Sequence, residues 1–354
     1  MTANQFAMTP AEQTIAKCAE LYAQYGYRRF TMNKFEDYAL YAENKNFLVD
    51  GRLLTFTDGA RLKALKPDIT LSIVKSLAAN PRLPLKAFYN ETVYRVKKGE
   101  KEFSELHQMG LELIGDGSVY ATSEVLGLAK ISLDAIDKRN ILDISHMGIL
   151  MPLIDSACES GADREQLVAL ITQKNADGIA TMLGEQNPLV TLVSSYEPIV
   201  KMIPMLCDML PKTSAVQELS EIAQVLCAMG LDTNVYLDFS LMHDFGYYNG
   251  IIFKGYIKGV PVAVLSGGRY DPLLDRFGMS TAALGFAIYL DYIRYAEAKH
   301  DTDVLLMYSD NDKAADVARA VKLLTEQGYI VLASKFEQEN RNIVKVFEDK
   351  EVLA

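Results

Sequence analysis

Two polar side chains at an even spacing mark a stretch where binding chemistry is possible. Leu106–Ile114 has the composition of a β-strand, in which side chains alternate between two faces. Gln108, Gly110 and Glu112 therefore share one face, and the apolar residues between and beyond them share the other. We interpret the polar face as the floor of a site for a small polar ligand. The alternative is a half-exposed strand whose polar face meets water.

An acid and a hydroxyl two residues apart form a second candidate. Asp68 and Thr70 lie in the segment LKPDIT, where a proline-led loop precedes a predicted helix that runs through Ala78. Both are residue types that cap helices by accepting a hydrogen bond from a backbone N–H. Taken alone, the segment is as well explained by capping as by ligand binding, and the other motifs decide between the two.

A pair of glycines ends the third candidate, the stretch Phe239–Asp271. Residues 251–257 are predicted as a strand, Lys258-Gly259 as a turn and Val260–Leu265 as a second, apolar strand. Gly267-Gly268 follow directly and would let the backbone approach a ligand closely. The alternative is an ordinary hairpin that ends in a flexible loop.

Together these segments resemble the class II histidyl-tRNA synthetases. KAFYNETVYRV at 86–96, with its loop and second strand, resembles motif 2, and FSLM followed by GYYNGIIF and SGGRYDPLL resembles the histidine-specific segment and the strand after it. Residues 280–292 resemble motif 3, and LKPDIT resembles the family's R-P-E-x-T element with two conservative changes. The resemblance spans most of the chain and is strongest from Lys66 to Glu112 and from Phe239 to Tyr292.

The resemblance implies a site for histidine. In the family, the acid and the threonine hold the α-amino group of histidine, and the glutamine and glutamate of H-Q-x-G-x-E bind the substrate. The implied ligand-binding residues are Asp68, Thr70, Arg95, Gln108, Glu112, Tyr247 and Tyr248.

The groups needed for amino-acid activation are mostly missing. This reaction joins a carboxylate to the α-phosphate of ATP, so the site must hold fixed cations against the accumulating negative charge. The family places three arginines there, but only Arg95 has a clear counterpart, since His243 and Tyr292 occupy the other two positions. Lys97 also replaces the glutamate that meets adenine. We therefore expect no enzyme activity, no catalytic residues, no cofactor and no metal.

A fold that keeps the amino-acid site and loses catalysis resembles one branch of this family, the regulatory subunits of ATP phosphoribosyltransferase. The resemblance implies a non-catalytic subunit that activates a short catalytic subunit in the first step of histidine biosynthesis. It also implies that histidine acts as the inhibiting effector and that the chain self-associates as a dimer. A divergent histidyl-tRNA synthetase and a stand-alone histidine-binding module remain open as alternatives.

The elements that must position these residues form an α+β fold. The resemblance implies a class II synthetase-like antiparallel sheet flanked by helices in residues 1–300, with a helical insertion at about 151–230. Residues 301–354 are predicted as a truncated α/β unit like the front of an anticodon-binding domain, with a helix over 311–327 and a short helix from Arg341. Thr9-Pro10-Ala11-Glu12 predicts the start of the first helix as a capping box.

Composition limits the possible partners and locations. The 354 residues are 49% hydrophobic and 23% charged, which is typical of soluble globular proteins, and no apolar run reaches the ~18 residues of a membrane helix. A net charge of −10 makes nucleic-acid binding a weak expectation. The N-terminus MTANQFAMTP lacks secretory features, and the four separated cysteines are expected to be buried, reduced thiols. The expected location is the cytoplasm, without membrane contact.

Overall fold

The computed structural model describes residues 8–44, 52–96, 102–158, 160–211, 213–242, 247–293, 302–336 and 343–348. It divides into two compact units, one formed by Thr14–Ile293 and the other by the rest of the chain. The larger unit carries every candidate site residue named above. Its predicted α+β architecture, an antiparallel sheet flanked by helices, is confirmed.

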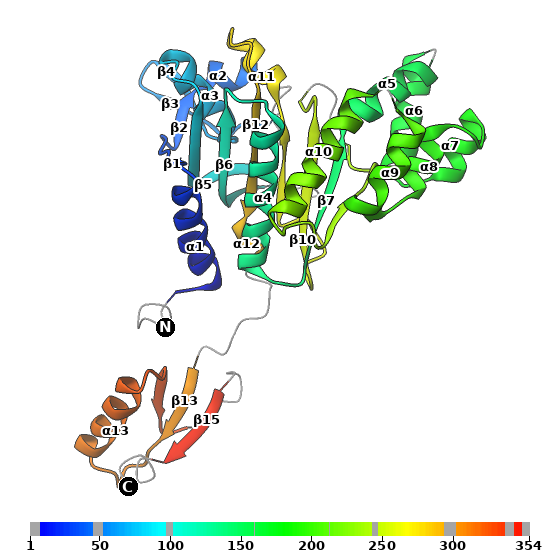
Figure 1. The fold of residues 1–354 in the computed structure, drawn as a ribbon. Coiled ribbons are helices and arrows are strands. Elements are labelled where there is room, and N and C mark those ends of the chain that lie inside the picture. The colour runs from blue at the N-terminus through cyan, green and yellow to red at the C-terminus, as the bar shows by residue number, and fades with distance from the viewer. Residues whose placement is uncertain are drawn as a thin grey trace. The chain divides into compact units, whose positions relative to one another are not determined.

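A nine-stranded sheet, counted over the described residues, is the centre of the larger unit (Figure 1). The strand order is β1-β5-β6-β12-β11-β10-β7-β9-β8, and every neighbouring pair from β5 to β7 is antiparallel. The strands are β1 Arg28–Arg29, β5 Leu85–Val96, β6 Phe103–Ile114, β7 Asn140–His146, β8 Glu197–Pro198, β9 Val235–Leu237, β10 Ile251–Ile257, β11 Leu265–Arg269 and β12 Ala283–Tyr289.

One face of this sheet is apolar and covered by helices. Phe88, Leu111, Phe286 and the side-chain-free Gly267 follow one another across β5, β6, β12 and β11. Tyr22 of helix α1 (Pro10–Gln24) packs its ring edge-on at 6.0 Å from Phe88 and 6.1 Å from Phe286. Helix α4 (Val119–Ile136) runs over the same sheet and contacts β10 and β12. The predicted apolar face of β6 is thus confirmed.

The opposite face carries smaller elements at one end. Helices α3 (Thr70–Ala79) and α11 (Asp271–Arg276) bury their apolar side chains in one cluster with Tyr89 and Ile114 of the sheet. Helix α2 (Tyr38–Glu43) and a second sheet join this end. That sheet has the order β2-β4-β3, with β2 Phe35–Asp37, β3 Thr55–Asp58 and β4 Arg61–Leu65.

A helical segment follows β7, as the sequence predicts. Its first helix is capped by His146, whose Nδ1 accepts a hydrogen bond from the Gly148 amide at 3.0 Å, while its Nε2 lies 3.3 Å from Glu218 Oε2. The helices, grouped beside the sheet in Figure 1, are α5 Met147–Ala157, α6 Gly161–Thr172, α7 Ala176–Leu183, α8 Pro188–Ser194, α9 Ile199–Met209 and α10 Ser214–Ala228. The short α12 is Leu290–Ile293.

The smaller unit contains a parallel three-stranded sheet of order β14-β13-β15 and helix α13 (Ala314–Glu326). The strands are β13 Thr302–Met307, β14 Val331–Ser334 and β15 Ile343–Glu348. The short helix predicted from Arg341 is wrong: Arg341 itself lies outside the described residues, and Ile343–Glu348 is a strand parallel to β13. Residues 343–347, IVKVF, are mostly β-branched or aromatic, which favours a strand when an open edge is available.

Two further expectations need correction. Residues 260–264 are not a strand: the strand is β11, Leu265–Arg269, so Gly267 and Gly268 lie within the sheet and not in a loop. The four cysteines are free thiols, but only Cys18 is buried and Cys227 is exposed.

The capping box is confirmed, with the Thr9 amide 2.7 Å from Glu12 Oε2. No described helix is long and apolar enough to cross a membrane.

Candidate ligand-binding site

The centre of the site is the buried carboxyl group of Glu112 on β6, which is 2% exposed. Thr70, the first residue of α3, donates its hydroxyl to Oε1 at 2.9 Å, and the Tyr270 hydroxyl donates to Oε2 at 2.6 Å. Burial raises the pKa of Glu112 to about 8, the two hydrogen bonds oppose this rise, and the nearby Asp68 adds to it. The group is therefore mostly protonated at neutral pH and would ionise readily beside a bound cation.

Asp68 lies in the loop between β4 and α3, beside Arg95 of β5, and has more than one partner. Its Oδ1 accepts a hydrogen bond from the Leu71 amide at 2.9 Å, which caps α3 as one of the two interpretations predicts. Its Oδ2 lies 3.3 Å from an Arg95 guanidinium nitrogen, and Arg95 Nε also donates to the Pro67 carbonyl. Burial raises the pKa of Asp68, while Arg95 and the backbone donors oppose the rise. Capping does not exclude binding, because the carboxylate stays beside Glu112.

Two glycines next to Glu112 let side chains lie directly against the sheet. Gly285 is the cross-strand neighbour of Glu112, and Gly268 is the neighbour of Gly285, so one row of the sheet has no side chains there. A Cβ at Gly285 would overlap Glu112 Oε2, and a Cβ at Gly268 would lie 2.7 Å from the Tyr248 ring. The missing side chains thus let the Glu112 carboxyl and the Tyr248 ring lie against the backbone. The glycine pair predicts a close approach of the backbone to a ligand. The group that lies close to Gly268 is the Tyr248 ring, and Gly268 is inside a strand. Ligand binding beside the glycines stays a prediction.

Three tyrosine rings lie near Glu112. Tyr247 and Tyr248 contact each other edge-on with ring centroids 4.6 Å apart, and Tyr247 lies 6.1 Å from the ring of Tyr270. Burial raises the pKa of Tyr247, and the negative charges of Asp68 and Glu112 raise it further. Aromatic faces next to acidic groups suit a flat or cationic ligand group.

The seven predicted residues are not equally close to one another. Hydrogen bonds, ring contacts and shared electrostatic effects join Asp68, Thr70, Arg95, Glu112, Tyr247 and Tyr248. Gln108 is 3% exposed and lies on the same face of β6, between Glu91 of β5 and Tyr289 of β12. It is four residues from Glu112, which is about 13 Å along a strand, so it would meet a different part of a ligand.

Comparison with known proteins identifies the family. The model of the histidyl-tRNA synthetase family matches residues 7–293. The chain belongs to the histidyl-tRNA synthetase family. It is 27% identical to the ATP phosphoribosyltransferase regulatory subunit of Alkaliphilus metalliredigens, over 89% of this chain and 85% of that protein.

Two solved structures share the fold of this family member. One is described as an ATP phosphoribosyltransferase regulatory subunit/histidyl-tRNA synthetase from Bacillus halodurans, with a TM-score of 0.73, 24% identity, and coverage of 96% of this chain and 93% of that one. The other belongs to the ATP phosphoribosyl transferase complex of Thermotoga maritima, with a TM-score of 0.63, 19% identity, and coverage of 79% and 97%.

Of the three positions at which the resemblance implies arginines for ATP, two carry other residues here. Tyr292, at the motif 3 position, lies in α12 with its ring 6.0 Å from that of Tyr289. The one arginine with a counterpart, Arg95, is engaged by Pro67 and Asp68. His243 and Lys97, the other altered positions, lie outside the described residues.

The sequence did not predict the role of Tyr270. Its hydroxyl makes the shorter of the two hydrogen bonds to Glu112, although 158 positions separate the two residues. The available signal was the motif GGRYD, in which the tyrosine directly follows β11. Lys66, which is buried and stands at the arginine position of R-P-E-x-T, forms an ion pair with β5. Its Nζ lies 2.5 Å from Glu91 Oε2.

Proposed function

We propose that this chain is the non-catalytic regulatory subunit of an ATP phosphoribosyltransferase. It activates a short catalytic subunit, and it transmits inhibition by histidine, the end product, to the first step of histidine biosynthesis. The observation that carries this proposal is a contrast between the groups around Glu112 and a position that the resemblance assigns to ATP binding. The acidic and aromatic groups around Glu112 are assembled, whereas a tyrosine, Tyr292, stands in place of the motif 3 arginine.

The chemistry of the site supports histidine as the effector. Glu112 and Asp68 together present acidic oxygens to an ammonium or imidazole group, and Tyr247 and Tyr248 present rings to a flat one. The glycines at 268 and 285 let the Tyr248 ring and the Glu112 carboxyl lie directly against the sheet, which supports a site built from these two groups. Regulation further requires that histidine bind one conformation of the complex more tightly than another.

The partner follows from the relatives. The name of the matched Alkaliphilus protein describes a regulatory subunit, and the structure from Thermotoga maritima is described as a complex. The main test is reconstitution of a purified short catalytic subunit with this chain. We expect the two to co-purify, phosphoribosyl transfer to rise on addition of the chain, and histidine to inhibit the complex. Unchanged transfer with and without the chain, in both the presence and absence of histidine, rejects the proposal.

A divergent histidyl-tRNA synthetase is the competing function. Loss of one preorganised charged group of this kind costs on the order of 10²–10³ in rate, and the arginine position of motif 3 is Tyr292. We therefore expect no histidine-dependent exchange between pyrophosphate and ATP. Exchange at rates normal for a synthetase, or charging of tRNA by the chain alone, favours the competing function.

The assignment of the binding residues has its own test. Gln108→Ala removes a buried hydrogen-bonding group, worth about 1–3 kcal/mol toward a charged ligand, or roughly 5- to 150-fold in affinity. Calorimetry with histidine measures this change, and circular dichroism checks the fold. Gln217→Ala, at an exposed position of α10, is the matched control and should bind normally. Wild-type affinity of Gln108→Ala means that Gln108 does not line the site.

The remaining features of the proposal concern assembly and location. The chain is expected to self-associate as a dimer, and light scattering on the purified protein measures this directly. Phe35, Phe56 and Leu62 of the small sheet are 43%, 38% and 47% exposed, which supports an interface there. The expected location is the cytoplasm, and cell fractionation tests it.

A further inference from the structure

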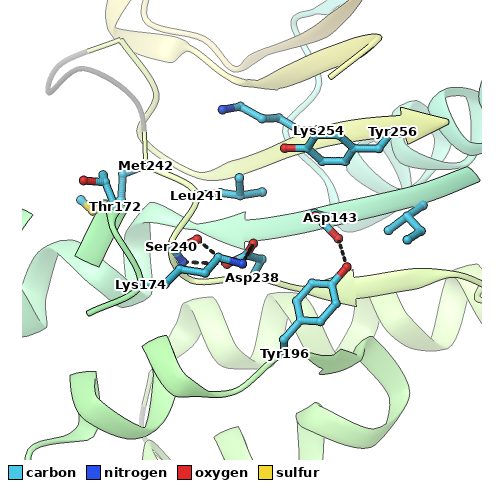
Figure 2. A pocket seen from close by; sticks show the side chains of 11 residues that line it. Asp143, Thr172, Lys174, Tyr196, Asp238, Ser240, Leu241, Met242, Lys254 and Tyr256 are labelled. Atoms are coloured by element: carbon cyan, nitrogen blue, oxygen red, sulfur yellow. Dashed lines mark hydrogen bonds and ion pairs between the residues drawn. The ribbon is translucent and has the colours of Figure 1, made fainter. Parts of the chain in front are cut away.

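A pocket lies between the sheet and the helical segment, away from Glu112 (Figure 2). Its volume is about 490 Å³, within the range typical of small-molecule sites. Lys254 on its wall pairs with Ser266, Ser266 with Ala287, and Ala287 with Gly110, so the pocket lies three strands, roughly 14 Å, from β6. The residues that line it are Ile141, Asp143, Thr172, Lys174, Tyr196, Asp238, Ser240, Leu241, Met242, Lys254 and Tyr256.

Two buried carboxyl groups form the acidic wall of this pocket. Asp238, 5% exposed, is satisfied: Lys174 Nζ lies 2.8 Å from its Oδ2, and the Ser240 hydroxyl donates to its Oδ1 at 2.6 Å. Asp143, 7% exposed, accepts a hydrogen bond from the Tyr196 hydroxyl at 2.9 Å. Burial raises the pKa of Asp143 to about 6, and the neighbouring Asp238 adds to the rise. A cationic donor bound at Asp143 would relieve this cost.

The donor to Asp143 is held in a fixed position. The ring of Tyr196 stacks on Tyr236 with centroids 4.9 Å apart and planes 8° from parallel. The ammonium group of Lys174 lies over the same Tyr196 ring, with Nζ 5.1 Å from the ring centre. Tyr196 is therefore held in place before a ligand binds. Its hydroxyl uses one of the acceptor positions of the Asp143 carboxylate, and a carboxylate can accept further hydrogen bonds at the others.

Basic groups oppose the acidic ones. Lys254 is the cross-strand partner of Asp143, and in Figure 2 its ammonium group points away from that carboxylate. With Lys174, the described lining residues carry two positive and two negative side chains, and a ligand of net charge would meet repulsion from one pair. A ligand that carries both charges, separated by a few ångströms, meets the opposite sign at each end.

We propose that this pocket binds a small zwitterion of the α-amino-acid type, with its ammonium group at Asp143 and its carboxylate toward Lys254. Leu241 and Met242 supply an apolar surface for the ligand's side chain. The site shares no residue with the one around Glu112, and the inference does not rest on the proposed regulatory function.

The test screens the twenty standard amino acids against the full chain by thermal shift, followed by calorimetry of those that stabilise it. Asp143→Asn keeps the shape of the wall but removes the charge, and Gln108→Ala perturbs only the other site. We expect at least one amino acid whose affinity falls at least tenfold in Asp143→Asn and stays within twofold in Gln108→Ala.

Two more variants keep the test decisive if Asp143→Asn fails to fold. Lys254→Met should weaken the same amino acid at least fivefold, and Lys201→Met, at an exposed position of α9, is its matched control. If no amino acid shows a loss in the Asp143 and Lys254 variants, or if none binds except through Gln108, the inference is overturned. Loss of histidine binding in Gln108→Ala alone concerns the Glu112 site and leaves this pocket unaffected.

Discussion

Glu112→Gln is expected to stabilise the ligand-free protein at neutral pH. The pKa of Glu112 is about 8 in the fold and 4.5 in an unfolded chain, mainly because burial disfavours the charged carboxylate. The favourable contribution of such a group is fully present below pH 4.5 and is lost as the pH rises to about 8, since the unfolded chain releases its proton first. Glutamine removes this dependence and keeps the shape, and the hydroxyls of Thr70 and Tyr270 can both donate and accept.

The size of the effect follows from the two pKa values. At about 1.4 kcal/mol per pH unit, the interval from 4.5 to 7 costs the wild-type protein roughly 3 kcal/mol at pH 7, and the full interval to 8 costs about 5. The stability advantage of the variant over the wild type should therefore grow by about 4 kcal/mol from pH 5 to pH 8. Its affinity for histidine should fall at the same time, a trade of activity for stability.

Urea unfolding followed by circular dichroism at pH 5, 6, 7 and 8 measures this difference. Glu165→Gln, at an exposed position of α6, is the matched control and should track the wild type at every pH. Parallel pH curves for Glu112→Gln and the wild type, or lower stability of the variant at pH 8, would refute the electrostatic description of the site.

Three other substitutions test the packing around the site by urea unfolding. Gly285→Ala should destabilise the protein by more than about 2 kcal/mol, because its Cβ would overlap the Glu112 carboxyl. Gly161→Ala, where a Cβ meets open space, should be close to neutral. Equal effects of the two substitutions would contradict the close contact between Gly285 and Glu112. Asp68→Ala should cost about 1–2 kcal/mol through loss of the α3 cap, and Asp68→Asn should recover most of it; a full loss in both variants shows that the ion pair with Arg95 dominates. Lys66→Met leaves the half-buried Glu91 without its partner and should cost up to about 3 kcal/mol, and the added change Glu91→Leu should restore stability. No recovery in the double variant argues against a charge effect.

The sequence predicted the part of the site that strand alternation controls. The two-residue period of β6 was sufficient to place Gln108 and Glu112 on one face and the apolar residues on the other. The resemblance to histidyl-tRNA synthetases added Thr70, Tyr247 and Tyr248, which the structure brings near Glu112. Whether these residues bind histidine stays a prediction.

The errors share a physical cause. Residues 260–264, VPVAV, have strand-like composition, but the true strand begins at Leu265, because pairing with β12 selects the register. Glycines are poor strand formers by composition, yet Gly267 and Gly268 are in β11 because Phe286 and Tyr248 occupy the space beside them. The start of a strand and the place of a glycine thus depend on residues that are distant in sequence. The same holds for the pocket around Asp143, because its lining residues come from five separate segments of the chain.

The contacts of Glu112 also suggest how a ligand at this site can influence distant parts of the larger unit. Both carboxyl oxygens accept hydrogen bonds, one from Thr70 at the start of α3 and one from Tyr270 just before α11. A ligand that donates to Glu112 must share or replace these bonds, so its binding free energy depends on the positions of both helices. Since α3 and α11 pack in one cluster, a shift of either helix requires the other to adjust its packing. A ligand with such differential contacts meets the condition for regulation, because it binds one arrangement of these helices better than another.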